Sequence, residues 1–305
     1  MFVRDMLFLS SERRSRALGR IIVGVSALFL ASCSESSADA KANDKPPAEK
    51  AASATPSQLA ISTDPAPSKD AHQVTIVVLG SSSPAGKNIY KLFNRPKAEE
   101  PEYAVKYNWV TLYDARLKEI DPQNNVINLA AASGHSTSIA LNEKKGGPLY
   151  KSSLAYALSA YPHADATIVN FPAIRGQEGE DVAGVVANLQ EIEKRALAAG
   201  VGKVWIATAQ PAANKTECFK TKSGECDAGL TIYQTRIDLT DAIIAAFPGR
   251  YLDFYSPLSK DRSLQSVADP ALLNPIDKLH PNLAGHEALR DAVIKAGVYE
   301  AAAKN

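Results

Sequence analysis

Two short segments, far apart in the chain, carry residue types that together could perform nucleophilic catalysis. The first is a serine-rich turn, residues 80–86, with Ser82 near its centre. The second lies near the C-terminus and places Asp277 three residues before His280. An aspartate at this spacing can accept a hydrogen bond from the histidine Nδ1–H, which leaves Nε2 free to take a proton from a serine. The pattern therefore indicates a Ser-His-Asp arrangement that is assembled only when the chain folds.

The serine turn follows the first of several apolar, β-branched runs. Each run is continuous rather than alternating, which is typical of strands that are buried on both faces of a parallel sheet. The predicted strands are residues 74–79, 126–129, 166–170, 203–207 and 250–254.

Helical patterns separate these runs. Apolar residues recur at helical spacing in residues 182–199, 230–247 and 283–296, and Gly200 predicts the end of the first of these helices. Tyr107, Trp109 and Tyr113 are expected to pack into the core from a further helix. The alternation predicts an α/β fold, a three-layer α/β/α sandwich with a central parallel sheet. In such folds the active site lies at the carboxyl ends of the strands, where we expect both chemical segments.

Four segments resemble the sequence blocks of the SGNH (GDSL-like) hydrolases. Residues 80–86 are similar to the first block, in the variant with Gly-Ser-Ser in place of Gly-Asp-Ser, and residues 277–286 match the last block nearly residue for residue. Residues 128–134 are similar to the second block, although one residue longer, and residues 205–211 resemble the fourth strand and its exit. The resemblance spans residues 74–296 and implies a flavodoxin-like hydrolase fold without a metal or cofactor.

The resemblance also implies a role for each residue of the site. Ser82 corresponds to the nucleophile, His280 to the general base and then acid, and Asp277 to the residue that orients it. The backbone N–H groups of Ser82 and Gly134 correspond to the oxyanion hole.

Ser81 and Ser83 are rival nucleophiles by residue type alone. The position of Ser82 relative to Gly80 and Gly86 favours it over both neighbours.

The third block departs from the family pattern. The family has an asparagine after the third strand as another oxyanion donor, and Ile174 stands at that place here. Losing one such donor typically lowers kcat by about 100- to 1000-fold. Arg175 or Asn170 could supply a replacement donor; the alternative is that Arg175 is a solvated loop charge and Asn170 a strand-end residue.

The N-terminus reads as an export signal. Arginines precede an apolar run, residues 21–31, that is shorter than a membrane span, and the run ends at Cys33 in a pattern that resembles the lipobox of bacterial lipoproteins. We therefore expect a signal peptide over residues 1–32, and a lipidated Cys33 with a disordered tether over residues 33–72. The hydrolase-like domain is predicted over residues 73–305. By the same resemblance the protein is exported and anchored to a bacterial membrane, with the outer membrane favoured.

Cys218 and Cys226 are the two cysteines of the folded part. A close pair in an exported chain predicts a disulfide, which would stabilise the fold by about 2–3 kcal/mol. The alternative is a metal site, but no second pair of ligands lies nearby. The formal net charge of +1 offers no basic excess for nucleic-acid binding.

These features predict a serine esterase that acts on an ester substrate, such as an O-acetyl or short acyl group on a carbohydrate. Two alternatives use the same fold. One is a lipoprotein with weakened catalysis that acts in binding or envelope assembly, as the loss of the third-block asparagine allows. The other is an acyltransferase, in which a sugar hydroxyl replaces water.

Overall fold

The computed structural model describes residues 73–131, 136–142, 151–171, 181–216, 218–220 and 226–304. A five-stranded parallel sheet forms the centre of this part, with strand order β2-β1-β3-β4-β7. This is the order of flavodoxin-like sheets, in which the chain reverses direction across the sheet between the first and third strands. The strands are β1 (Thr75–Gly80), β2 (Asn125–Asn128), β3 (Ala166–Asn170), β4 (Val204–Ala207) and β7 (Tyr251–Leu252).

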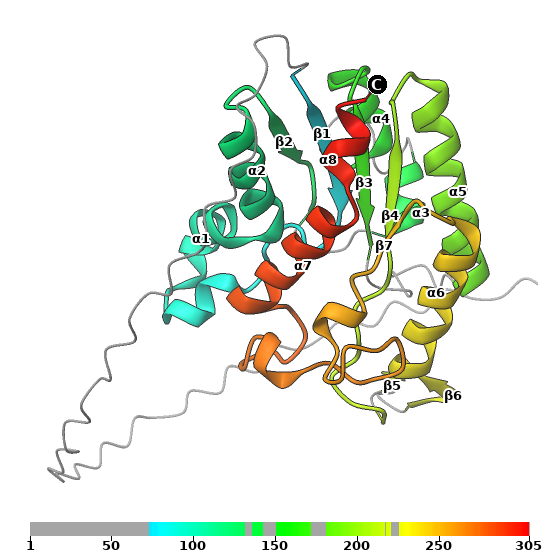
Figure 1. Cartoon of the computed structure of the whole chain (residues 1–305). Helices are drawn as coiled ribbons and strands as arrows, with labels where there is room; N and C mark the ends of the chain where they lie inside the picture. Colours follow the sequence, from blue (N-terminus) through cyan, green and yellow to red (C-terminus); the bar gives the residue numbers. More distant parts are fainter. Residues whose placement is uncertain are drawn as a thin grey trace, which may run out of the picture. The chain divides into compact units, whose positions relative to one another are not determined.

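Helices cover both faces of the sheet, so the predicted three-layer α/β/α sandwich is confirmed (Figure 1). One core lies under α2, α7 and α8 and includes Trp109 and Tyr113, as expected from the sequence. The other lies under α3 to α6. The helices are α1 (Glu100–Tyr107), α2 (Trp109–Ile120), α3 (Thr137–Leu141), α4 (Leu154–Ala160), α5 (Val182–Ala198), α6 (Ile232–Ala246), α7 (Leu283–Lys295) and α8 (Val298–Ala302).

Several of the long helices begin at a residue whose side chain accepts a backbone N–H of the first turn. Asp181 caps α5 in this way, Thr231 caps α6 and Asn282 caps α7. These residue types are the preferred N-caps because they satisfy donors that the helix itself leaves unpaired. Gly200 follows α5 with a φ of 95°, a conformation that glycine adopts without strain. The end of α5 predicted from that glycine is therefore confirmed.

The sequence patterns missed several short elements. A 3₁₀ helix, η1 (Ile89–Phe93), follows the serine turn. Three further 3₁₀ helices are η2 (Lys97–Glu99), η3 (Ser256–Leu258) and η4 (Pro270–Leu272). An antiparallel pair, β5 (Cys218–Lys220) and β6 (Cys226–Thr231), forms a separate small sheet.

Candidate active site

The serine turn leaves β1 at the carboxyl edge of the sheet. Gly80 is required here, because a Cβ at this position would lie 2.5 Å from the Asn170 carbonyl oxygen. Ser81 is buried and donates its backbone N–H to the same carbonyl at 3.2 Å. Ser83 is also buried, and its hydroxyl accepts a hydrogen bond from Gln210 Nε2 at 2.6 Å. Ser82 is the one serine of the three whose side chain is partly exposed.

The backbone N–H of Ser82 has a further property that an oxyanion donor needs. Among the described residues, no acceptor forms a hydrogen bond with it, whereas the Ser82 carbonyl accepts the N–H of Lys87 at 3.0 Å. Within the part of the chain that the structure describes, the turn therefore presents both a hydroxyl and an N–H without a hydrogen-bond partner.

The second segment is a compact loop that joins η4 to α7. The Asn274 N–H donates to the His280 carbonyl at 2.8 Å, and the Lys278 N–H donates to the Asn274 carbonyl at 2.8 Å. Asn282 closes the far end, with its Nδ2 bonded to the carbonyls of Ala271 and Leu273. The loop is thus held by its own hydrogen bonds before any ligand arrives.

Inside this loop, Asp277 binds His280 twice. Its Oδ1 accepts the His280 backbone N–H at 3.0 Å and the Leu279 N–H at 2.9 Å, while its Oδ2 lies 3.1 Å from His280 Nδ1. His280 is only 7% exposed. The carboxylate can only accept, so Nδ1 carries the proton of this bond and Nε2 is the free, basic nitrogen.

The charge of Asp277 is stabilised by these bonds. Burial alone would raise the pKa of its carboxyl group, but the hydrogen bonds from the His280 ring and from the N–H groups of His280 and Leu279 outweigh that effect. They hold the pKa of Asp277 well below its ordinary value, so the residue stays ionised at neutral pH.

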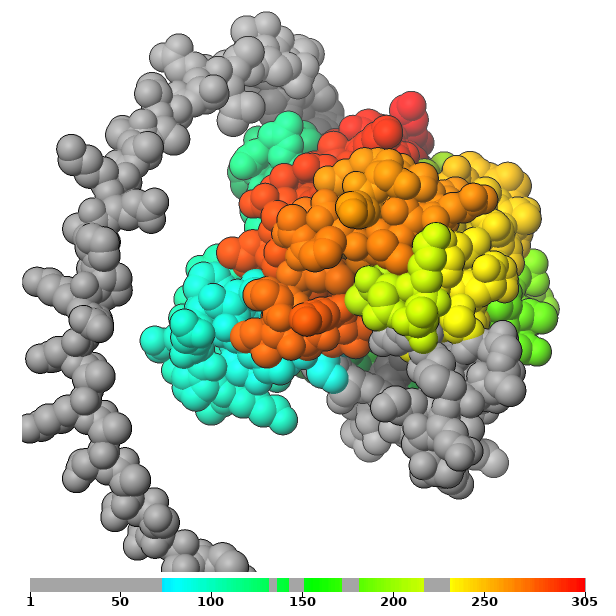
Figure 2. Space-filling view, turned by 90° about the horizontal axis from the view of Figure 1, so that it is seen from below, coloured from blue at the N-terminus to red at the C-terminus, as the bar shows by residue number. Residues whose placement is uncertain are grey.

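Two hydrogen bonds join Asn88, two residues after the serine turn, to the Asp277–His280 loop, although 189 positions separate the partners of one of them. Asn88 Nδ2 donates to Asp277 Oδ2 at 2.6 Å, and Asn274 Nδ2 donates to the Asn88 carbonyl at 3.0 Å. Figure 2, seen from below, shows the cyan N-terminal region of the described chain against the orange C-terminal region to which the two segments belong. Sequence reasoning missed Asn88 and Asn274, because neither stands in a motif of its own.

His286, six residues after His280, has a different environment. It is completely buried in α7, and its Nδ1 accepts the Trp109 backbone N–H at 3.2 Å. Burial, with a smaller contribution from the charge of His280, lowers the pKa of His286 to about 3. The residue joins α7 to α2 as a neutral ring, which is a structural role.

Asn170 ends β3 beside the serine turn and is completely buried. Neither polar atom of its side chain has a hydrogen-bond partner among the described residues. A buried amide without partners is costly, so such groups commonly serve a ligand or an ordered water. The other predicted donors, Gly134 and Arg175, lie outside the described residues, as does Ile174.

Cys33 also lies outside the described residues. Cys218 and Cys226 each begin a strand of the small antiparallel sheet, in which Cys218 is paired with Thr231 and Lys220 with Cys226. The disulfide between them stays a prediction.

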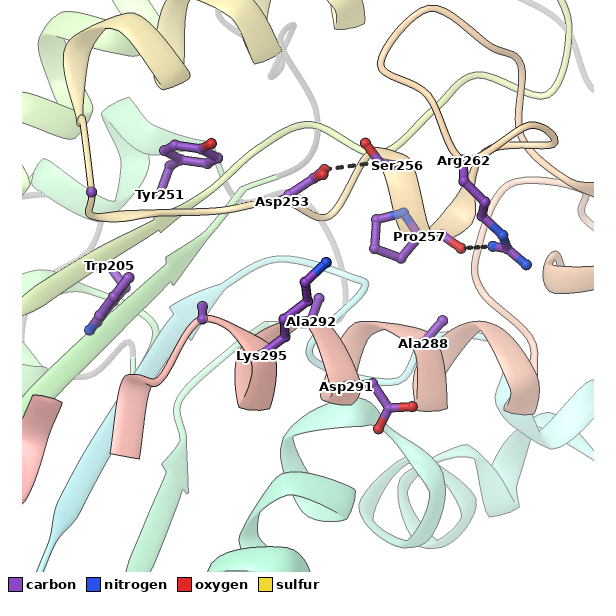
Figure 3. A pocket seen from close by; sticks show the side chains of 12 residues that line it. Trp205, Tyr251, Asp253, Ser256, Pro257, Arg262, Ala288, Asp291, Ala292 and Lys295 are labelled. Atoms are coloured by element: carbon purple, nitrogen blue, oxygen red, sulfur yellow. Dashed lines mark hydrogen bonds between the residues drawn. The ribbon is translucent and has the colours of Figure 1, made fainter. Parts of the chain in front are cut away.

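A separate open groove of about 770 Å³ lies between α7 and the β4–β7 edge of the sheet. Figure 3 shows Trp205 and Tyr251 on the strand side, and Ala292 and Lys295 on the helix side. None of the residues proposed for chemistry lines it.

The described residues contain neither a candidate metal site nor a helix that could span a membrane. No group of three or more His, Cys, Asp or Glu side chains in this part of the chain is arranged to hold a metal ion. No helix within the same ranges has the length and apolar character needed to cross a bilayer.

No protein-family model matches the sequence, and no curated protein does. Solved structures do resemble it. A GDSL-like lipase from Bacteroides thetaiotaomicron is 14% identical, with a TM-score of 0.48 over 74% of this chain and 88% of the lipase. A psychrotrophic esterase from a Pseudoalteromonas species is 18% identical, with a TM-score of 0.46 over 74% of this chain and 97% of the esterase. A variant of an acetyl-xylooligosaccharide esterase from a Geobacillus species is 16% identical, with a TM-score of 0.47 over 73% and 93%.

Proposed function

We propose that the protein is an ester hydrolase of the SGNH type, with Ser82 as nucleophile. The observation that carries the proposal is the Asp277 carboxylate, which accepts from His280 Nδ1 at 3.1 Å and from Asn88, two residues after the serine turn, at 2.6 Å. One side chain thus fixes the histidine tautomer and joins the histidine loop to the segment that presents the partly exposed Ser82.

The reaction follows from these roles. His280 Nε2 removes the proton of the Ser82 hydroxyl while the oxygen attacks the ester carbonyl, and the imidazolium that forms is stabilised by Asp277. The same Nε2–H then protonates the leaving alcohol, which leaves an acyl-enzyme on Ser82. A water molecule, deprotonated by His280, attacks the acyl group and releases the acid.

The oxyanion of each tetrahedral intermediate needs hydrogen-bond donors. We assign this role to the N–H groups of Ser82 and Gly134, with Asn170 or Arg175 replacing the amide that Ile174 lacks. The free N–H of Ser82 and the unpartnered, buried amide of Asn170 support the assignment.

The proposed substrate is an O-acetyl or other short acyl ester on a carbohydrate. The proposed location is the bacterial envelope, with Cys33 lipidated and the protein held to the outer membrane. Fractionation of a Cys33→Ser variant checks the anchor: the variant should leave the membrane fraction, and full retention in high salt would contradict it.

Hydrolysis of p-nitrophenyl acetate beside esters of longer chains tests the activity. We expect turnover that falls with acyl length and is lost in Ser82→Ala, whereas the buried neighbour Ser81→Ala keeps it within a few-fold. A Ser82→Ala variant as active as the parent would overturn the proposal. Transfer to an added sugar at the expense of hydrolysis would favour the acyltransferase, and a fully inert protein would favour a binding role.

A further inference from the structure

Asn88 lies two residues after the serine turn, at the start of η1, and its side chain contacts Asp277. Its backbone N–H donates to Glu100 Oε1 at 2.8 Å, and its carbonyl accepts from Asn274 Nδ2 at 3.0 Å. Its side-chain Nδ2 donates to Asp277 Oδ2 at 2.6 Å. Asn88 therefore joins the serine turn to α1 and to the Asp277–His280 loop at the same time.

The bond to Asp277 is made to a particular oxygen. Oδ1 is occupied by two backbone N–H groups of its own loop, whereas Oδ2 is shared by Asn88 Nδ2 and His280 Nδ1. The amide is neutral and donates only one of its protons here, so it fixes the position of Oδ2 without adding a charge that would compete with the imidazolium.

The residue type suits both the backbone and the bond. Asn88 has a φ of 66°, in the left-handed region that asparagine and glycine tolerate better than other residues. Glycine would keep the turn but lose the donor. Aspartate would keep the shape but place a second carboxylate against Asp277, and like charges at this separation repel strongly.

We propose that Asn88 is a positioning residue of the hydrolase, which sets the spacing between the Ser82 turn and the Asp277–His280 pair through Asp277 Oδ2. This inference rests on the proposed function. Asn88 does not touch the substrate; it acts through Asp277, so its loss affects the catalytic step rather than binding.

The test compares Asn88→Gly with Asn94→Gly. Asn94 ends the same 3₁₀ helix, η1, and also has a left-handed φ, of 52°, which makes it a matched control for the backbone effect. We expect Asn88→Gly to lower kcat about tenfold with KM changed less than twofold, and Asn94→Gly to change neither. An unchanged kcat in Asn88→Gly, or an equal loss in both variants, would overturn the proposal.

A double-mutant cycle with Asp277→Ala separates positioning from a general effect on folding. If Asn88 acts through Asp277, Asn88→Gly should add less than a twofold further loss of kcat once the carboxylate is gone. Independent, multiplying losses would show that Asn88 acts elsewhere.

A readout without turnover distinguishes failure of this inference from failure of the proposed function. The low-field proton resonance of the His280 Nδ1–H bond should move or disappear in Asn88→Gly and stay in place in Asn94→Gly. If Ser82→Ala proves silent while this resonance responds to Asn88→Gly, the hydrolase proposal fails but the contact stands. A resonance unchanged by Asn88→Gly overturns the role of Asn88 whatever the activity.

Discussion

The Asp277–His280 loop and the groove beside β7 differ in size and in hydrogen bonding. The loop is small, polar and joined to the serine turn through Asn88 and Asn274. The groove has a volume of about 770 Å³ and is lined by Trp205 and by Ala288 and Ala292 of α7, among other residues. In this protein the proposed site is the region where hydrogen bonds from separate segments converge, and not the region with the larger volume.

The physical reason lies in what each region must do. A general base has to hold one tautomer in one orientation, and the two oxygens of Asp277 supply that by binding four donors. The groove has no comparable network: of the polar groups drawn in Figure 3, Asp253 bonds the N–H of Ser256 and Arg262 bonds the Pro257 carbonyl. These bonds hold the local turn, and Asp291, which also lines the groove, is paired with its neighbour Arg290. Each of these bonds is local to its own segment and does not join separate parts of the chain.

The largest effect should come from removing the nucleophile and the base. Ser82→Ala and His280→Ala should each lower kcat by about 1000-fold or more, and the double variant should be no worse than either single variant, because such residues act as a unit. Steady-state kinetics on p-nitrophenyl acetate measures this. Losses that multiply would show that the two side chains do not share one site.

Asn170 should have the next largest effect. Asn170→Leu replaces an unpartnered buried amide by an apolar side chain of similar size, so the free energy of unfolding should be unchanged or higher. If the amide binds the oxyanion, kcat should nevertheless fall by about 100-fold with KM nearly constant. Chemical denaturation and kinetics on the same sample check both parts. A more stable variant with full activity would leave Arg175 as the replacement donor to test.

The strands of the sheet and the Asp277–His280 pair could be predicted from the sequence. The apolar runs located all five strands of the parallel sheet, because strands buried on both faces need continuous apolar side chains. The spacing of Asp277 and His280 predicted their hydrogen bond, since three residues of tight loop bring them together.

Other features have no local signal. The bond from Asn88 to Asp277 joins residues that only the finished fold brings together, and an asparagine in a polar turn looks the same with or without it. The β5–β6 pair was missed because neither strand is a continuous apolar run: β5 contains Lys220, and β6 contains Asp227 and Gly229. The groove depends on where α7 stops covering the sheet, which periodicity does not reveal.

His286 is a structural histidine, in contrast to His280, the proposed general base. Its pKa is lowered to about 3 in the folded state by burial, while an unfolded chain would have the ordinary value of about 6.5. The unfolded state therefore binds more protons between these values, and stability should fall as the pH decreases from about 6.5, by on the order of 1 kcal/mol per pH unit. Denaturation between pH 6.5 and 4.5 should show a shallower slope for His286→Gln. His163→Gln, which changes an exposed histidine, should keep the parent slope.

The smallest effect is expected in the groove, and it tests the other half of the comparison. Ala292 lines the groove from α7, ten residues beyond the Asn282 cap, so Ala292→Phe should fill part of the groove without touching the Asp277–His280 loop. We expect kcat/KM within twofold of the parent for every ester tested, because no hydrogen bond of the site is altered. The free energy of unfolding should change by no more than about 0.5 kcal/mol, as for other substitutions at partly exposed positions. A tenfold loss of kcat/KM at unchanged stability would mean that the groove takes part in binding the substrate, and volume would then locate function here as well as hydrogen bonding does.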